Sequence, residues 1–156
     1  VTEGVALAQK HKLPPQVIDF IRTHHGRGYT KYFYTMYCNE HPGEIVDLAP
    51  FSYPGPNPFS RETGILMLAD AVEASSRSLK EYTVESITAL VERIVDGIVA
   101  DKLLDNTPLT FREITTIKET FVSKLLTMNH SRIAYPKLNR EEATASTPNE
   151  EKREEK

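Results

Sequence analysis

Two adjacent histidines, His24 and His25, are the residues of this sequence whose types most directly imply chemistry. Neutral imidazole is the commonest metal ligand in proteins. Adjacent residues on a helix point about 100° apart, so the pair would not chelate one ion as an i, i+4 pair does. The histidines could serve two ions, or one could bind a metal while the other orients a ligand. The alternative is structural, because the helix dipole stabilises a charged histidine in a last turn by roughly 0.3–1 kcal/mol.

Asp70 is the second candidate because the sequence around it is apolar. It follows a run from Ile65 to Ala69 whose composition predicts burial. A carboxylate beside a core is costly unless a partner compensates its charge. Arg77 has Glu73 four residues before it, whereas Asp70 has no cation of its own at helical spacing. A metal ion would satisfy Asp70, and so would a hydrogen bond at a partly solvated boundary between helices.

Arg61 is a weaker candidate, for binding an anionic group of a substrate. It begins the predicted helix that carries Asp70 and directly follows a proline-rich loop. An arginine in such a place is more often a surface residue. Four tyrosines between positions 29 and 37 could stack on a base, although such clusters are usually packing residues with solvated hydroxyls. The sequence contains no P-loop, zinc-finger spacing or nucleophile-elbow motif.

Helices are predicted to position these residues. A short helix begins at Pro14 and Pro15, where a first turn tolerates proline, and ends at the histidines, with Gly26 just beyond them. The segment 29–41 favours a further amphipathic helix, and an irregular loop with five prolines runs up to Phe59. Residues 1–13 have a rough helical spacing without an N-cap, so we expect the chain to be a piece of something longer.

Three longer helices are predicted in the second half of the chain. Their expected caps are Asn57 before Pro58, then Thr83, then a capping box of Thr110 with Glu113. The apolar stripes of these helices are the expected core: Ile65, Leu68, Ala69, Val72 and Leu79; Ile87, Leu90, Val91, Ile94 and Ile98; Ile114, Ile117, Phe121, Leu125 and Met128. Without a convincing strand, the predicted fold class is all-α. One domain is expected over 1–138, followed by a charged, disordered tail over 139–156.

The composition excludes several classes of protein. Hydrophobic residues make up 39% and charged residues 26% of the chain, as in ordinary globular proteins. The net charge of −3 shows no basic excess, so DNA or RNA is not an expected partner. No apolar run is long enough to cross a bilayer. The lone cysteine, Cys38, suits a reducing compartment such as the cytoplasm.

Four blocks of the sequence carry a resemblance to a known family: LPPQVIDFIRTHHGRGYTKYFY, FSYPGPNPFSRETGILMLADAVEASSRSL, PLTFREI and HSRIAYPKL. They resemble the end of the HD hydrolase domain of bacterial seven-transmembrane receptors with an intracellular HD domain. The resemblance covers nearly the whole chain up to about Leu138. It implies the C-terminal portion of the helical HD-domain fold.

The resemblance also implies a site for two divalent ions, usually iron or manganese. The ligands of the family run in the order His, His-Asp, His, His-His and Asp. His24 and His25 match the His-His step, and Asp70 matches the final Asp. The earlier ligands would precede Val1 and are absent from this chain. Arg27 stands where the family usually has a threonine, which places a cation near the site.

The activity that the resemblance implies is hydrolysis of cyclic di-AMP to the linear dinucleotide pApA. A metal-bound water would attack in line, and no side chain is assigned to catalysis. The parent protein is expected on the cytoplasmic face of the bacterial inner membrane. The isolated chain is expected to be soluble, to hold no metal or an incomplete set, and to be inactive. Its exposed apolar faces are expected to be covered by a partner, such as a second copy in a homodimer.

Two alternatives to this function stay open at the level of sequence. One is a helical module that binds a nucleotide or transmits a signal without catalysis. The other is a phosphohydrolase of the same HD fold that acts on another nucleotide.

Overall fold

The computed structural model describes residues 1–130, and this part of the chain contains helices and no strand. Its elements are α1 (Thr2–Lys10), α2 (Pro15–Thr23), α3 (Lys31–Glu40), the 3-10 helix η1 (Ala49–Phe51), α4 (Arg61–Ser76), α5 (Val84–Ala100) and α6 (Phe111–His130). The all-α prediction is confirmed. The predicted tail over 139–156 lies outside the described residues. No helix within residues 1–130 combines the length and the apolar character that a membrane crossing needs.

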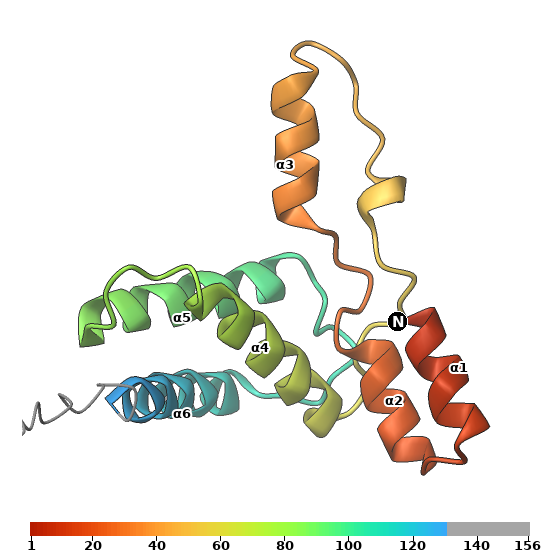
Figure 1. Ribbon diagram of the computed structural model, residues 1–156. Coiled ribbons are helices and arrows are strands. Elements are labelled where there is room, and N and C mark those ends of the chain that lie inside the picture. Colours follow the sequence, from red (N-terminus) through yellow and green to blue (C-terminus); the bar gives the residue numbers. More distant parts are fainter. Residues whose placement is uncertain (131–156) are drawn as a thin grey trace, which may run out of the picture.

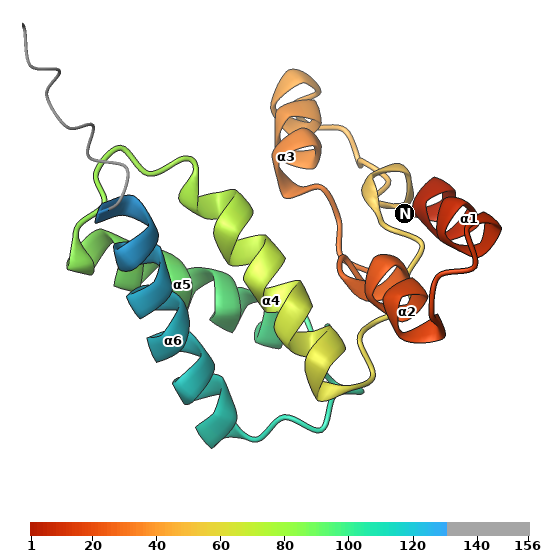
Figure 2. The same cartoon turned by 60° about the horizontal axis from the view of Figure 1, so that its bottom comes forward.

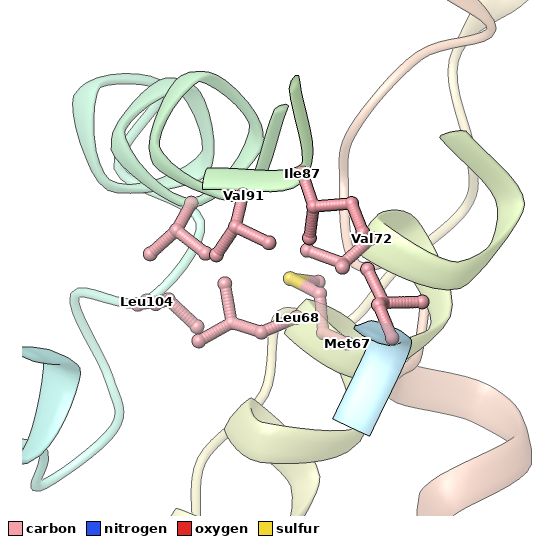
Figure 3. Close-up of a cluster of buried hydrophobic side chains, with 8 residues drawn as sticks. Met67, Leu68, Val72, Ile87, Val91 and Leu104 are labelled. Carbon is pink, nitrogen blue, oxygen red and sulfur yellow. The ribbon is translucent and has the colours of Figure 1, made fainter. Parts of the chain in front are cut away.

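The core lies between α4, α5 and α6, which pack together as Figure 2 shows. Leu68 of α4 and Ile87, Val91 and Val95 of α5 have no exposed surface. Figure 3 shows side chains from these helices meeting in one cluster. The cluster contains eight buried residues: Met67, Leu68, Val72, Ile87, Val91, Val95, Leu104 and Leu125. Most of the predicted apolar stripes therefore do form the core.

Two residues of the predicted stripes are exposed. Ile65 is 38% exposed and Met128 is 48% exposed, whereas Met67, which lies outside the predicted stripe, is buried. The reason lies in a second contact of α4, because this helix packs against α2 as well as against α5 and α6. A Cβ added to Gly26, just past α2, would lie 2.7 Å from Cε of Met67. The buried surface of α4 is therefore wider than one apolar stripe.

Two of the three predicted caps are confirmed, and one is wrong. Thr83 caps α5, and Thr110 exchanges hydrogen bonds with a glutamate at the start of α6. Asn57 does not cap α4, because Ser60 does so in a capping box. The Oδ1 atom of Asn57 accepts a 2.8 Å hydrogen bond from the backbone N–H of Arg27. The side chain of Asn57 therefore holds the loop that follows the histidines.

An arm formed by α3, η1 and the chain between them stands away from the other helices in Figure 1. No residue of α3 is buried, and its Tyr32 and Phe33 are 70% and 60% exposed. The base of the arm is closed by backbone hydrogen bonds. The N–H of Tyr53 donates to the carbonyl of Gly28 at 2.8 Å. This closure returns the proline-rich loop to the segment that follows the histidines.

Candidate metal centre

His24, His25 and Asp70 come together in the folded chain although they lie far apart in the sequence. One ligand atom from each residue falls in a group whose members all lie within 4.8 Å of one another. Nδ1 of His25 is 3.8 Å from Oδ2 of Asp70. The contact between α2 and α4 produces this meeting, because the histidines directly follow α2 and Asp70 lies within α4.

His24 is held by the end of the helix that precedes it. Its Nδ1 lies 2.7 Å from the carbonyl oxygen of Ile21. A carbonyl oxygen can only accept, so Nδ1 carries the hydrogen and donates it, and Nε2 keeps its lone pair. A ring nitrogen bound to a carbonyl in this way is the usual support of a histidine that binds a metal through the other nitrogen. The helix-end role and the ligand role are therefore compatible in this one residue.

His25 lies between two aromatic rings. Its ring centroid is 4.0 Å from that of His24, and 4.1 Å from that of Tyr53, on which it is stacked. The expectation that adjacent histidines diverge assumed that both were helical, whereas α2 ends at Thr23 and His25 lies in the turn beyond it. Burial lowers the pKa of His25 below its ordinary value of 6.5, the charge of His24 lowers it further, and Asp70 opposes both effects. His25 is therefore neutral at neutral pH, as a metal ligand must be.

Asp70 is less buried than its sequence neighbours predicted, since its side chain is 44% exposed. Within the described residues it forms no ion pair with a lysine or an arginine. Arg77 pairs with Glu73 at 2.8 Å, as predicted. The ion-pair partner of Asp70 is His25. The partial solvent access of Asp70 agrees with the structural explanation of this residue, and its position beside the two histidines keeps the metal explanation open.

A cavity of about 390 Å³ opens beside these three residues. Its walls come from the end of α2, the start of α3, and α4 and α5. It lies within the size range of small-molecule sites, which is about 300–1,000 Å³. Two cations, Lys31 and Arg93, line it together with Tyr53. A ligand in this cavity would touch the His–His–Asp group and basic side chains at the same time.

Known proteins resemble this chain over most of its length, although no protein-family model matches it. An uncharacterised Synechocystis protein, slr0104, is 42% identical over 140 residues, which cover 88% of this chain and 17% of that protein. The cyclic-di-AMP phosphodiesterase PgpH of Bacillus subtilis is 37% identical over 143 residues, or 89% of this chain and 19% of PgpH. The chain thus spans less than a fifth of the length of these curated relatives.

A solved structure shares the fold. The crystal structure of the Listeria monocytogenes PgpH HD domain in complex with cyclic-di-AMP matches with a TM-score of 0.76 and 30% sequence identity. The match covers 81% of this chain and 58% of that one. The chain is homologous to part of the PgpH HD domain. The family resemblance and the HD fold predicted from the sequence are thereby confirmed.

The nitrogen and oxygen donors of His24, His25 and Asp70 fit a divalent metal ion. Two imidazoles and a carboxylate are a common ligand set, and ligand atoms lie about 2.0–2.2 Å from a metal such as zinc. Two ligands of one such ion are then at most about 4.4 Å apart, so small side-chain rotations would bring the atoms into range. Three protein ligands on one side of a metal ion would leave its other coordination positions open.

The structure does not bring Arg61 or Arg27 into the cavity of the HD domain. Nε of Arg61 donates to the carbonyl of Pro108 at 3.1 Å and lies 3.4 Å from Oε1 of Glu113. Arg61 thereby ties the start of α4 to the start of α6. The side chain of Arg27 lies against Gly55, where an added Cβ would be 2.7 Å from its Cγ. Arg27 is close to the histidines in sequence, but its side chain is not among those that line the cavity.

Tyr53, Lys31 and Arg93 also line the cavity, and they were not among the predicted site residues. No local pattern distinguishes Tyr53, which reaches His25 only because the base of the arm closes. Lys31 and Arg93 lie on different helices, and Lys31 approaches the cavity through its ion pair with Asp101 at the end of α5.

The pKa of His25 is expected to rise toward 6.5 when Tyr53 is replaced by alanine. The stacked ring covers one face of the imidazole, and burial is the main cause of the lowered pKa. Titration of the imidazole protons by NMR measures this shift. Tyr53→Phe keeps the ring and should leave the pKa lowered. An equally low pKa in Tyr53→Ala would show that the stack is not its cause.

Proposed function

We propose that this chain is part of a metal-dependent phosphodiesterase domain that hydrolyses a cyclic dinucleotide, cyclic di-AMP, to linear pApA. The observation that carries the proposal is the group of His24, His25 and Asp70 beside a cavity, in a chain whose homologues are cyclic-di-AMP phosphodiesterases. The relative solved with cyclic-di-AMP supports a cyclic dinucleotide as the ligand.

The three residues would hold a divalent ion, with Nε2 as the free nitrogen of His24. Two ions, iron or manganese, are proposed for the complete domain. Bound divalent ions supply polarisation of a water molecule and stabilisation of charge on the phosphoryl oxygens. Asp70 contributes the negative charge that offsets part of the metal charge. His25 contributes a neutral imidazole, because burial and His24 keep its pKa low.

Part of the proposed site lies outside this chain. The match covers 58% of the solved HD domain, and two imidazoles with one carboxylate are too few ligands for two ions. The complete protein is proposed to be anchored in the bacterial inner membrane with this domain on the cytoplasmic face. Membrane fractionation of the complete protein, with protease accessibility from each side, tests that placement.

The isolated chain is expected to hydrolyse no cyclic di-AMP in the presence of manganese. The same chain, extended in its parent protein to the length of the solved HD domain, is expected to release pApA. Chromatography of the reaction products measures both, and circular dichroism confirms that both proteins are helical. Turnover by the isolated chain would contradict the proposal that the site is shared.

The extended domain also separates the proposed function from its alternatives. No turnover of cyclic di-AMP with either manganese or iron would contradict the phosphodiesterase assignment. Binding without turnover would favour a nucleotide-binding module. Faster turnover of another nucleotide would favour a related phosphohydrolase.

A further inference from the structure

Arg93 is the uncompensated cation of the cavity wall. Both Lys31 and Arg93 line the cavity, but Nζ of Lys31 is 2.8 Å from Oδ2 of Asp101, a carboxylate that lines the same cavity. The charge of Lys31 is thereby offset. Arg93 is exposed and has no acidic partner within residues 1–130. The remaining carboxylate of the cavity, Asp70, lies against His25. An anion entering the cavity would therefore find a free guanidinium on α5.

The face of α5 that carries Arg93 also leaves space in the cavity. Arg93, Gly97 and Asp101 line the cavity at spacings of four residues, which places them on one face of the helix. Glycine is unfavourable inside a helix, and close packing of a neighbour is its usual justification. No described atom outside the local helix would lie within 4 Å of a Cβ at Gly97. The missing side chain therefore enlarges the cavity and serves no close contact among the described residues.

The chemistry of a cyclic dinucleotide matches this wall. Such a ligand carries two phosphodiester groups on opposite sides of its ring, so only one of them can lie at the His–His–Asp group. A guanidinium binds a phosphate through two parallel, charge-assisted hydrogen bonds. Arg93 comes from α5, whereas the candidate metal ligands come from the end of α2 and from α4. A cation on a separate wall is placed for the second phosphate.

We propose that Arg93 binds the phosphate of the dinucleotide that is not hydrolysed, and that Gly97 leaves the room for the adjoining nucleoside. This inference rests on the proposed function, whose substrate contacts it specifies. It makes Arg93 a binding residue and gives it no part in the bond-breaking step. It also separates two kinds of recognition: Arg93 acts on any phosphate, and Gly97 acts only on a ligand with a nucleoside.

The test uses the full 156-residue chain with a metal chelator present, so that it does not depend on the candidate metal ligands. Cyclic di-AMP and inorganic phosphate are titrated separately, and the backbone amide signals of α5 are followed by NMR. Both ligands are expected to shift signals around Arg93. Arg93→Gln is expected to lower the affinities for both ligands by about tenfold, because a charge-assisted contact is lost.

Two further variants sharpen the result. Arg112→Gln removes an exposed arginine of α6 that does not line the cavity, and it should leave both affinities unchanged. Gly97→Leu introduces a good helix former and should therefore preserve α5. This variant is expected to lower the affinity for cyclic di-AMP by about tenfold or more, because the leucine side chain of about four carbons fills space that only the nucleoside needs. The affinity for phosphate should stay as before. Circular dichroism and thermal melts check that each variant folds.

Unchanged affinities in Arg93→Gln would overturn the proposal, as would the absence of any ligand-dependent shift on α5 in the unaltered chain. Equal binding of cyclic di-AMP by Gly97→Leu and the unaltered chain would overturn the role of Gly97. Failure of the proposed function has a different signature, because it appears as missing hydrolysis in the extended domain. The binding titration without metal does not depend on whether the extended domain hydrolyses cyclic di-AMP.

Discussion

Replacement of Asp70 by asparagine is expected to lower turnover of cyclic di-AMP by about a hundredfold or more in the complete domain. Asparagine keeps the shape of the side chain but removes the negative charge and the anionic donor. Divalent ions contribute several kcal/mol of charge stabilisation in phosphoryl transfer, and about 2.7 kcal/mol corresponds to a hundredfold in rate. The metal content of the purified protein, measured by elemental analysis, should fall together with the rate.

Glu73→Gln is the matched control for this experiment. Glu73 lies on the same helix, three residues beyond Asp70, and its carboxylate pairs with Arg77 at the surface. The control removes one negative charge of α4 without touching the His–His–Asp group, so metal content and turnover should be retained. If Asp70→Asn kept both as well, Asp70 would not be a metal ligand. Equal losses in the two variants would instead indicate a general effect of charge on α4.

Replacement of Leu68 by alanine is expected to lower the free energy of unfolding by about 2–5 kcal/mol. Leu68 has no exposed surface and belongs to the cluster that joins α4 to α5, in which Figure 3 shows it together with Val91 and Leu104. The cost combines the lost burial of the side chain with the cavity left behind. A loss of this size is a large part of the 5–15 kcal/mol that stabilises a typical domain. Urea denaturation followed by circular dichroism measures it.

Leu66→Ala provides the comparison on the same helix. Leu66 is 38% exposed, so its truncation should cost about 1 kcal/mol or less. Two similar losses would show that α4 is not packed as described. The contrast between neighbouring leucines matters for function, because Asp70 lies on the same helix and the packing of Leu68 holds that helix in place.

The candidate site illustrates how far local sequence reaches. The residue types and the family resemblance singled out His24, His25 and Asp70, and the structure brings these residues together. The two histidine rings do not diverge as helical geometry predicted, because His25 lies beyond α2 and its ring packs against that of His24. A shift of one residue in the end of a helix changes the direction in which the next side chain points.

Residues outside recognisable motifs were found only in the folded chain. Tyr53 reaches His25 because a backbone hydrogen bond closes the base of the arm. Arg93 and Lys31 share a cavity because Lys31, at the start of α3, reaches Asp101 at the end of α5. Arg61, the weaker candidate for binding an anionic group, contacts Glu113 and Pro108 near the start of α6 and does not line the cavity. A sequence pattern reports the face of one helix, whereas a substrate cavity is formed by faces of several.

The sequence by itself determined the helical class, two of the three predicted caps and most of the core, because periodicity and capping depend on residues within a few positions of one another. The sequence also determined that the candidate metal ligands are two imidazoles and one carboxylate. Tertiary structure alone decided that α4 packs on α2 as well as on α5 and α6, which buries Met67 and brings Asp70 to the histidines. That outcome depends on contacts between distant segments, whose energies no local pattern contains.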